Sequence, residues 1–294
     1  MIVVTLVAPR PLPPEFVASL VHALGAHRAD RRDAFATDIY VEGDREAIRQ
    51  TVFARVGAAD AMAAGVDAVV QPAERRAKRL LISDMDSTLI GQECIDELAA
   101  VHDLKPQVAA ITERAMRGEL DFADALTERV ALLKGIPEAS IAELLERVIA
   151  PSPGAAELIA GAKAAGMRTV LVSGGFLHFT EPVAARLGID AAFANRLIAV
   201  DGVLTGAVGQ PILGADEKRV RLMAECEALG IGPEDAVAFG DGANDLAMIE
   251  AAGLGIAFRP KPILAAAADG VLRHCDLAAA LYALGLAPAE GDDR

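Results

Sequence analysis

The sequence predicts an α/β protein in which helices cover both faces of a parallel β-sheet, giving three layers. Short apolar runs alternate with stretches rich in Ala, Leu, Glu and Lys, and this alternation is typical of such a sheet. The apolar runs are residues 79–84, 168–175, 235–242 and 253–258. Hydrophobic residues make up 53% of the 294 residues, yet aromatic residues only 4%, with no Trp. Small aliphatic side chains therefore fill the core, which suits helices packed on a parallel sheet.

The first 75 residues predict a separate small domain. Apolar and alternating runs predict strands, and amphipathic runs predict helices, in residues 2–8, 14–26, 34–43, 44–57 and 66–72. Their order fits a ferredoxin-like βαββαβ domain of the α+β class. The polar and charged stretch 71–79 predicts a linker, so the domains are expected at 1–75 and 76–294.

Residues 92–150 interrupt the alternation of strands and helices. They contain four helical patterns with no strand between them, and they begin eight residues beyond Asp84. A helical insertion at this point of an α/β sheet would lie above the carboxyl ends of the strands. The sequence therefore predicts a helical cap.

Polar side chains follow three of the predicted strands. They are Asp84, Asp86, Ser173, Asp241, Asn244 and Asp245. Chemistry in parallel sheets sits at the carboxyl ends of strands. Two carboxylates about 4 Å apart repel by roughly 4 kcal/mol at an effective dielectric constant near 20, so such a group needs a cation. Oxygen ligands without imidazole or thiolate suit Mg²⁺, which also binds phosphate oxygens. The pattern favours phosphoryl chemistry.

Other sites that would use such residues fit less well. A calcium loop starting at Asp84 would place Leu89 and Ile95 where Gly and Glu are required. Neither a dinucleotide-binding nor a Walker glycine pattern is present, and Ser173 lacks the preceding Gly of a hydrolase elbow. The five histidines show no paired ligand spacing, which disfavours a histidine zinc site.

Charge and cysteine content bear on partners and compartment. A net charge of −14 disfavours binding to nucleic acid or anionic membranes. Three widely separated cysteines disfavour a disulfide framework and fit a reducing compartment. The sequence has no apolar run of membrane-spanning length and no basic leader, so we expect a cytoplasmic protein.

Four motifs carry a resemblance to a known superfamily. DMDST (84–88), VSGGF (172–176), Lys218 in ADEKR, and GDGANDLAM (240–248) follow one another in the order of the haloacid dehalogenase-like (HAD) phosphatases. Within that superfamily, GQECIDELA, ERAMRGELDF and LTERVALLKG resemble the cap of the phosphoserine phosphatases. The resemblance covers residues 79 to about 275 and implies a Rossmann-like core with a helical cap. It also implies Mg²⁺-dependent hydrolysis of O-phospho-L-serine to L-serine and phosphate, the last step of serine biosynthesis.

The resemblance implies a role for each polar strand-end residue. Asp84 would attack phosphorus and become an aspartyl phosphate, and Asp86 would act as general acid and then general base. Asp84, the backbone carbonyl of Asp86, and Asp241 would hold Mg²⁺. The residues implied to bind phosphate or to support that binding are Ser173, the Gly174 amide, Lys218, Asn244 and Asp245.

Substrate choice is expected to come from the cap. In the family pattern Glu93 meets the substrate ammonium and Arg129 its carboxylate, while Met116 and Phe122 form an apolar wall. Taken alone, Arg129 fits a solvated helix charge better than a binding residue, and Met116 or Phe122 fits core packing better. The shared spacing with the cap pattern favours the binding roles.

Two alternatives to this function stay open. The enzyme could be a related phosphotransferase, or a phosphatase of another small phosphomonoester such as phosphothreonine. The N-terminal domain resembles, in its element order only, the ACT-like domains that often bind amino acids and pair with copies of themselves. It could respond to serine, form a homodimer, or only stabilise the enzyme.

Overall fold

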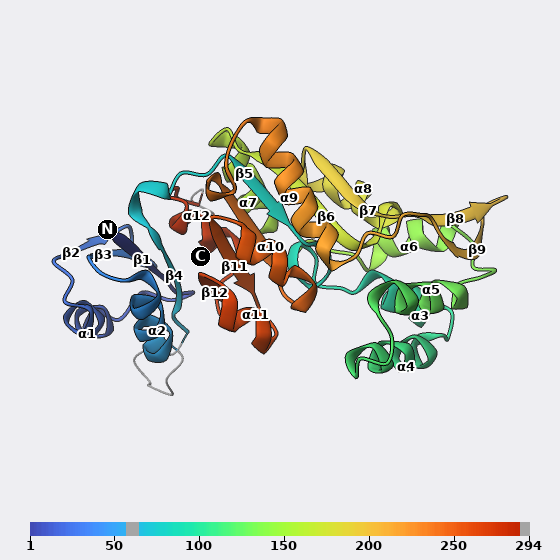
Figure 1. The fold of residues 1–294 in the computed structure, drawn as a ribbon, viewed down its shortest axis with the longest axis horizontal. Helices are drawn as coiled ribbons and strands as arrows, with labels where there is room; N and C mark the ends of the chain where they lie inside the picture. Colours follow the sequence, from blue (N-terminus) through green and yellow to red (C-terminus); the bar gives the residue numbers. More distant parts are fainter. Residues whose placement is uncertain (57–64, 289–294) are drawn as a thin grey trace.

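A computed structural model describes residues 1–56 and 65–288, and within them a ten-stranded sheet runs through the molecule (Figure 1). The strand order is β2-β3-β1-β4-β12-β11-β10-β5-β6-β7. The strands are β1 (Ile2–Val7), β2 (Arg28–Arg31), β3 (Ala36–Val41), β4 (Asp67–Pro72), β5 (Leu80–Ser83), β6 (Arg168–Phe176), β7 (Ala191–Asn195), β10 (Ala236–Gly240), β11 (Leu254–Phe258) and β12 (Gly270–Leu272). No helix of the described residues combines the length and apolarity needed to cross a membrane.

The half of the sheet from β12 to β7 is parallel and forms the centre of the larger unit. Successive side chains of a strand point to opposite faces. Leu81 and Leu171 accordingly join one apolar cluster, while Leu80, Ile82 and Val170 join another on the opposite face. The first cluster includes α7 (Ala155–Ala164) and α8 (Leu177–Leu187), and the second α9 (Ala215–Leu229), α10 (Leu246–Ala251) and α11 (Pro262–Ala267). The predicted three-layer α/β fold is confirmed.

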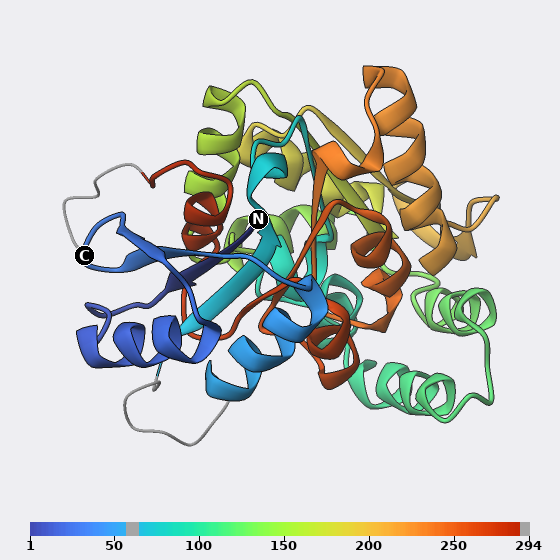
Figure 2. The ribbon, with the colours of Figure 1, turned by 60° about the vertical axis from the view of Figure 1, so that its left-hand side comes forward.

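The N-terminal unit, residues 1–72, has the expected βαββαβ order. Its helices α1 (Pro14–Leu24) and α2 (Arg45–Val56) lie on one face of four antiparallel strands (Figure 2). Ile2, Val4 and Leu6 of β1 are buried beneath these helices together with Phe16 and Val52. The strand order β2-β3-β1-β4 is that of a ferredoxin-like sheet.

The N-terminal sheet and the core sheet are continuous. Strand β4 pairs antiparallel with β12, and the backbone N–H of Val70 donates to the carbonyl of Asp269 at 2.9 Å. Parts of the stretch expected as a linker are built into the fold. Gln71 lies in β4 with 0% of its surface exposed, and Lys78 is only 7% exposed.

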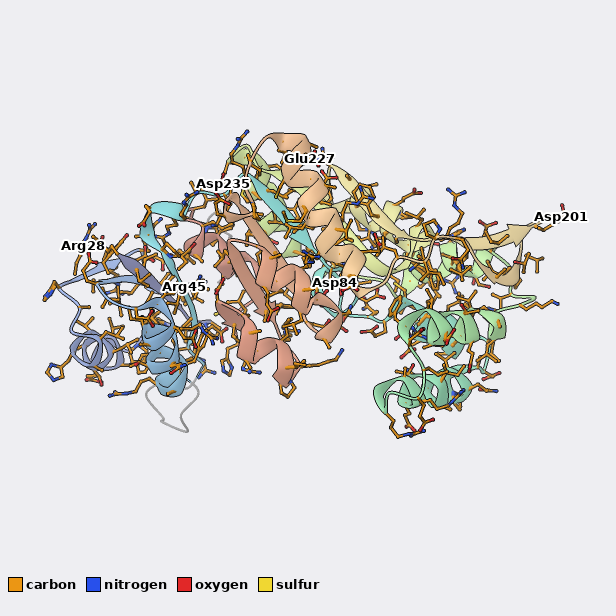
Figure 3. All side chains as sticks on the ribbon, in the orientation of Figure 1. Arg28, Arg45, Asp84, Asp201, Glu227 and Asp235 are labelled. Carbon is orange, nitrogen blue, oxygen red and sulfur yellow. The ribbon has the colours of Figure 1, made fainter. Side chains whose placement is uncertain are left out.

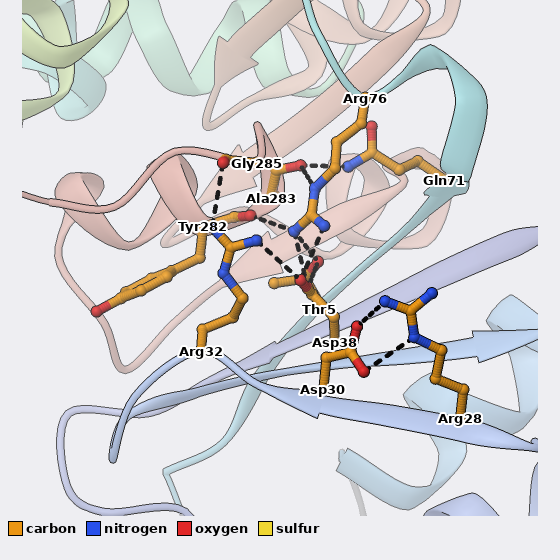
Figure 4. Close-up of polar contacts among 10 residues, drawn as sticks. All are labelled: Thr5, Arg28, Asp30, Arg32, Asp38, Gln71, Arg76, Tyr282, Ala283 and Gly285. Atoms are coloured by element: carbon orange, nitrogen blue, oxygen red, sulfur yellow. Dashed lines mark hydrogen bonds and ion pairs between the residues drawn. The ribbon is translucent and has the colours of Figure 1, made fainter.

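An ion pair between the buried Asp38 and the half-buried Arg76 strengthens this junction (Figure 4). Both carboxylate oxygens of Asp38 accept hydrogen bonds from Arg76, each at 2.8 Å, and Thr5 Oγ1 donates to Asp38 Oδ1 at 2.8 Å. Arg76 Nε and Gln71 Nε2 both donate to the carbonyl of Ala283, at 3.0 and 2.7 Å. The network therefore joins strands β1 and β3 to the C-terminal helix α12 (Ala280–Ala283).

The insertion predicted at residues 92–150 is a helical cap. It comprises α3 (Cys94–Val101), α4 (Lys105–Met116), α5 (Phe122–Leu132) and α6 (Ala139–Arg147). A β-bridge between Ile90 and Pro151 holds the two ends of the insertion together. Figure 1 shows α3, α4 and α5 at one end of the molecule and the N-terminal unit at the other.

A hairpin that the sequence analysis did not predict packs on the cap. Its strands are β8 (Leu197–Val200) and β9 (Val203–Val208), joined at Asp201 and Gly202, whose φ angles are 51° and 74°. Asp-Gly between apolar runs is a strong hairpin signal, because the turn requires positive φ at both residues. The N–H groups of Gly135 and Glu138 in the cap donate to the carbonyls of Leu204 and Gly202, each at 2.9 Å.

Candidate active site

The predicted strand ends meet at one pocket between the core and the cap. Asp84, which follows β5, lies between the sheet and the cap helices in Figure 3. The pocket has a volume of about 160 Å³, which fits a small metabolite. It is lined by Asp84, Asp86, Glu93, Ile95, Phe122, Leu126, Arg129, Ser173, Gly174, Gly175, Phe176, Asp241, Asn244 and Lys261.

Asp84 is held in place by its neighbours. It is 3% exposed, and its Oδ1 accepts a hydrogen bond from the backbone N–H of Met85 at 2.8 Å. The ammonium of Lys218 lies 2.8 Å from the same oxygen. The backbone N–H of Asp84 donates to the carbonyl of Phe239 at 3.0 Å, which fixes the residue against β10. One carboxylate oxygen is thus fully engaged, and the carboxylate cannot turn freely.

Asp86 is a half-buried carboxyl group that can carry a proton. Burial, followed by the charge of Glu93, raises the pKa of Asp86 to about 7. Among the described residues its Oδ1 has no hydrogen-bond partner. Ser87 has a φ of 54°, which turns the chain, and its Oγ donates to Glu93 Oε1 at 2.7 Å. Asp86 can therefore hold a proton near neutral pH and deliver it into the pocket.

The carboxyl end of β6 brings two glycines and a hydroxyl to the pocket. The N–H of Gly175 donates to Ser173 Oγ at 2.9 Å. A Cβ on Gly174 would lie 3.0 Å from Phe122 Cζ, and one on Gly175 would lie 3.1 Å from Ser173 Oγ. Only glycine fits this close approach without displacing a neighbour.

Lys218, from α9, lies beneath the carboxylates and is 1% exposed. Although burial disfavours the ammonium, Asp84 and Asp245 raise the pKa of Lys218, so it stays charged. Its Nζ is 2.6 Å from Asp245 Oδ1. The other oxygen of Asp245 accepts the N–H groups of Asp241 and Gly242, both at 3.1 Å. Asp245 therefore fixes both the lysine and the loop after β10.

A cation would fit among the carboxylates. Among the described residues, one oxygen each of Asp84, Asp241 and Asp245 lie within 4.8 Å of one another. Burial raises the pKa of Asp84 and Asp241, because clustered, desolvated anions are unfavourable. The expected ligands were Asp84, the Asp86 carbonyl and Asp241. Asp245 also joins the cluster, but its oxygens are already engaged by Lys218 and two amides.

The cap supplies the opposite wall of the pocket. Phe122, Leu126 and Arg129 of α5 all line it, and their spacing of four and three residues places them on one helix face. Burial lowers the pKa of Arg129. Glu93, directly before α3, contributes a carboxylate to the same pocket. Met116, the remaining cap residue that was predicted, ends α4, and its side chain lies outside the described part of the chain.

Lys261 is a pocket residue that the sequence analysis missed. Its Nζ lies 3.1 Å from Asp241 Oδ2, and its backbone N–H donates to the carbonyl of Asp241 at 2.8 Å. The sequence did contain a signal for Lys261, because this polar residue follows shortly after β11, one of the four predicted core strands. Ile95 and Leu126 were also missed, since an apolar helix residue that lines a pocket looks in the sequence like one in the core.

Comparison with known proteins identifies the family of the chain. The model of the haloacid dehalogenase-like hydrolases matches residues 81–250, which is more than half of the chain. The chain belongs to the haloacid dehalogenase-like hydrolases. Phosphoserine phosphatase of Albidiferax ferrireducens is 52% identical over 188 residues, covering 62% of this hydrolase and 79% of the relative. The phosphoserine phosphatase of Idiomarina loihiensis is 51% identical, covering 65% of this hydrolase and 86% of the relative.

Solved structures extend the similarity. A HAD family hydrolase from Salmonella enterica subsp. enterica serovar Typhi has a TM-score of 0.87 at 30% identity, covering 96% of this hydrolase and 98% of that chain. A phosphoserine phosphatase solved as an analogue of the phospho-aspartyl intermediate has a TM-score of 0.65 at 43% identity. The alignment of the two covers 70% of this hydrolase and 98% of the chain of that phosphatase. The first similarity therefore includes the N-terminal unit, whereas the second covers less of the chain.

Proposed function

We propose that this hydrolase is a phosphoserine phosphatase, which converts O-phospho-L-serine to L-serine and phosphate. The observation that carries the proposal is the make-up of one small pocket. Asp84 and Asp86 form its reactive side, while Glu93 and Arg129 stand on its cap side. A substrate with a phosphate, an ammonium and a carboxylate matches these groups, and the curated relatives bear the name of this activity.

The first half of the reaction transfers the phosphoryl group to Asp84. We assign Oδ2 as the attacking oxygen, because Oδ1 is held by Met85 N–H and Lys218. A bond forms between this oxygen and phosphorus while the bond from phosphorus to the seryl oxygen breaks. Asp86, with its pKa near 7, donates its proton to the departing seryl oxygen.

The second half of the reaction releases phosphate from Asp84. Asp86, now ionised, accepts a proton from a water molecule, whose oxygen attacks the aspartyl phosphate. The bond from phosphorus to Asp84 breaks and the carboxylate is restored. Ser173 and the Gly174 amide bind phosphoryl oxygens, and the buried ammonium of Lys218 offsets the negative charge in both halves.

Mg²⁺ is the proposed cofactor. Asp84, Asp241 and the backbone carbonyl of Asp86 would hold it, with Asn244 and Asp245 orienting the surrounding groups. The oxygen-only donor set and the raised pKa values of Asp84 and Asp241 fit a hard divalent cation. The ion would offset charge on the transferring phosphoryl group, so that an anionic carboxylate can approach it.

A substrate panel tests the proposal. Phosphate release from phosphoserine, phosphothreonine and an aryl phosphate should show the highest kcat/KM for phosphoserine. Chelation of divalent ions should abolish release, and added Mg²⁺ should restore it. A higher kcat/KM for phosphothreonine would replace the proposed substrate, and undiminished activity after chelation would remove the cofactor.

Arg129→Ala should separate substrate choice from chemistry. Arg129 is assigned to the substrate carboxylate, where the loss of a charge-assisted pair costs about 2 kcal/mol or more. We expect kcat/KM for phosphoserine to fall by about 30-fold or more, while hydrolysis of an aryl phosphate changes little. The control is Arg114→Ala, because Arg114 lies on α4 and pairs with Glu128 away from the pocket. Equal losses on both substrates in Arg129→Ala would contradict the carboxylate role.

A further inference from the structure

The pairing of β6 with β7 is interrupted where the phosphate-binding residues lie. The register of the two strands shifts between Val172 and Phe176, so the residues 173–175 stand out of the ladder. Such irregularities redirect side chains and backbone at active sites. They also leave backbone groups that need other partners, because a buried carbonyl without one is costly.

The side chain of Asn195 fills this gap. Asn195 ends β7, opposite Phe176, and is 2% exposed. Its Nδ2 donates to the carbonyl of Gly174 at 2.9 Å and to that of Leu213 at 3.1 Å. Its Oδ1 accepts the N–H of Leu213 at 2.6 Å. Both amide hydrogens and the oxygen are in use, and only this orientation of the amide satisfies two carbonyls and one N–H.

The bond to Gly174 has a consequence on the opposite side of the peptide. In a trans peptide the C=O and the following N–H point in opposite directions. With the Gly174 carbonyl held by Asn195, the Gly175 N–H points away from Asn195, where it donates to Ser173 Oγ at 2.9 Å. Two consecutive glycines have little conformational preference of their own, so an external bond is needed to fix the plane.

We propose that Asn195 is a positioning residue for the phosphate site. It holds the peptide between Gly174 and Gly175 in one orientation, and through that peptide it sets the Ser173 hydroxyl. Its two bonds to Leu213 anchor the same amide to the chain that enters α9, the helix of Lys218. The inference rests on the proposed function only in that Ser173 and Gly174 bind the phosphoryl group.

Asn195→Asp in the full chain tests this. The substitution keeps the shape and the acceptor for Leu213, but it places a carboxylate oxygen against the carbonyl of Gly174. With Mg²⁺ present, the inhibition constant of inorganic phosphate should rise about tenfold, a typical loss for a displaced hydrogen-bonding group. The rise should be the same whether phosphoserine or an aryl phosphate is the substrate. An unchanged constant would overturn the inference.

Combination with Ser173→Ala shows whether the effect runs through the hydroxyl. Ser173→Ala alone should raise the inhibition constant of phosphate about tenfold. The double variant should have a constant less than about threefold above that of Asn195→Asp alone. Equal increments in both backgrounds would mean that Asn195 acts elsewhere and would overturn the inference. If Asn195→Asp gives no cooperative melting curve, the cycle is measured with Asn195→Ala.

Thr205→Val is the control for a merely structural effect. Thr205 Oγ1 donates to the carbonyl of Ile198 at 2.8 Å, so its loss loosens the β8–β9 hairpin without touching Gly174. We expect no change in phosphate inhibition, and a tenfold rise in this variant would overturn the positioning role.

The two substrates distinguish a failure of the proposed function from a failure of the inference. Activity of the parent on the aryl phosphate but not on phosphoserine would reject the proposed substrate while leaving the Asn195 result interpretable. If Ser173→Ala alone has no effect on phosphate inhibition, both the phosphate-binding role of Ser173 and the positioning role of Asn195 are rejected.

Discussion

The Asp84→Asn variant should fold and release no measurable phosphate from phosphoserine. An amide cannot form the acyl phosphate, so the loss of kcat should exceed about three orders of magnitude. Lys218 has a second partner, Asp245, whose Oδ1 lies 2.6 Å away, so the site of the variant should not collapse. Phosphate release at saturating substrate and Mg²⁺ measures the effect. Activity within tenfold of the parent would rule out the assigned nucleophile.

The same variant should be more stable than the parent when both are free of metal. Burial and the nearby Asp245 raise the pKa of Asp84, which means that the folded state disfavours its anion. A neutral amide removes this penalty, so we expect the variant to melt at a higher temperature than the parent.

Asp190→Asn is the matched control for this gain. Although burial opposes it, hydrogen bonds from Lys163 and Thr169 lower the pKa of Asp190, so its anion is favoured in the folded state. The control should therefore melt at a lower temperature and keep its activity. A drop in melting temperature for Asp84→Asn like that of the control would contradict the electrostatic strain assigned to Asp84.

Removal of residues 1–75 should leave no stably folded phosphatase domain. Strand β12 would lose its partner β4, and the half-buried Arg76 would lose both oxygens of Asp38. Asp67, whose carboxylate accepts the N–H groups of residues 273–275, would be lost as well. These losses together approach the 5–15 kcal/mol by which a typical protein is stable. If the truncated protein melts cooperatively at the temperature of the full chain, this prediction is wrong. The N-terminal unit would then be a separable module, as expected for a regulatory domain.

Two aspartates on neighbouring strands refine the test within the full chain. Asp38→Ala should lower the free energy of unfolding by about 3–5 kcal/mol, because it leaves the half-buried guanidinium of Arg76 without its carboxylate partner. Asp30, its cross-strand neighbour, pairs with Arg28 at the exposed edge of the sheet (Figure 4), so Asp30→Ala should change stability little. Urea unfolding measures both. Similar losses of unfolding free energy in the two variants would show that the Asp38–Arg76 pair stabilises the protein no more than an exposed ion pair does.

The sequence by itself predicted which strand-end residues gather in the pocket, and it predicted the main architecture. Asp84, Ser173 and Asp241 each follow an apolar run, and parallel strands place their carboxyl ends together, so these residues had to meet. The helical cap followed from amphipathic periodicity without strands in residues 92–150, and the βαββαβ order followed from alternation and proline breaks. These features are local in the chain, which is why a pattern can reveal them.

Only the tertiary structure decided the remaining features, because each depends on partners far apart in the chain. Strand β12 has three residues and exists because β11 and β4 flank it, and this pairing fuses two units expected to be linked by a polar stretch. Asn195 finds Gly174 and Leu213 at separations of 21 and 18 residues, which no periodicity encodes. Residue types set which groups could react, whereas long-range packing set how those groups are held.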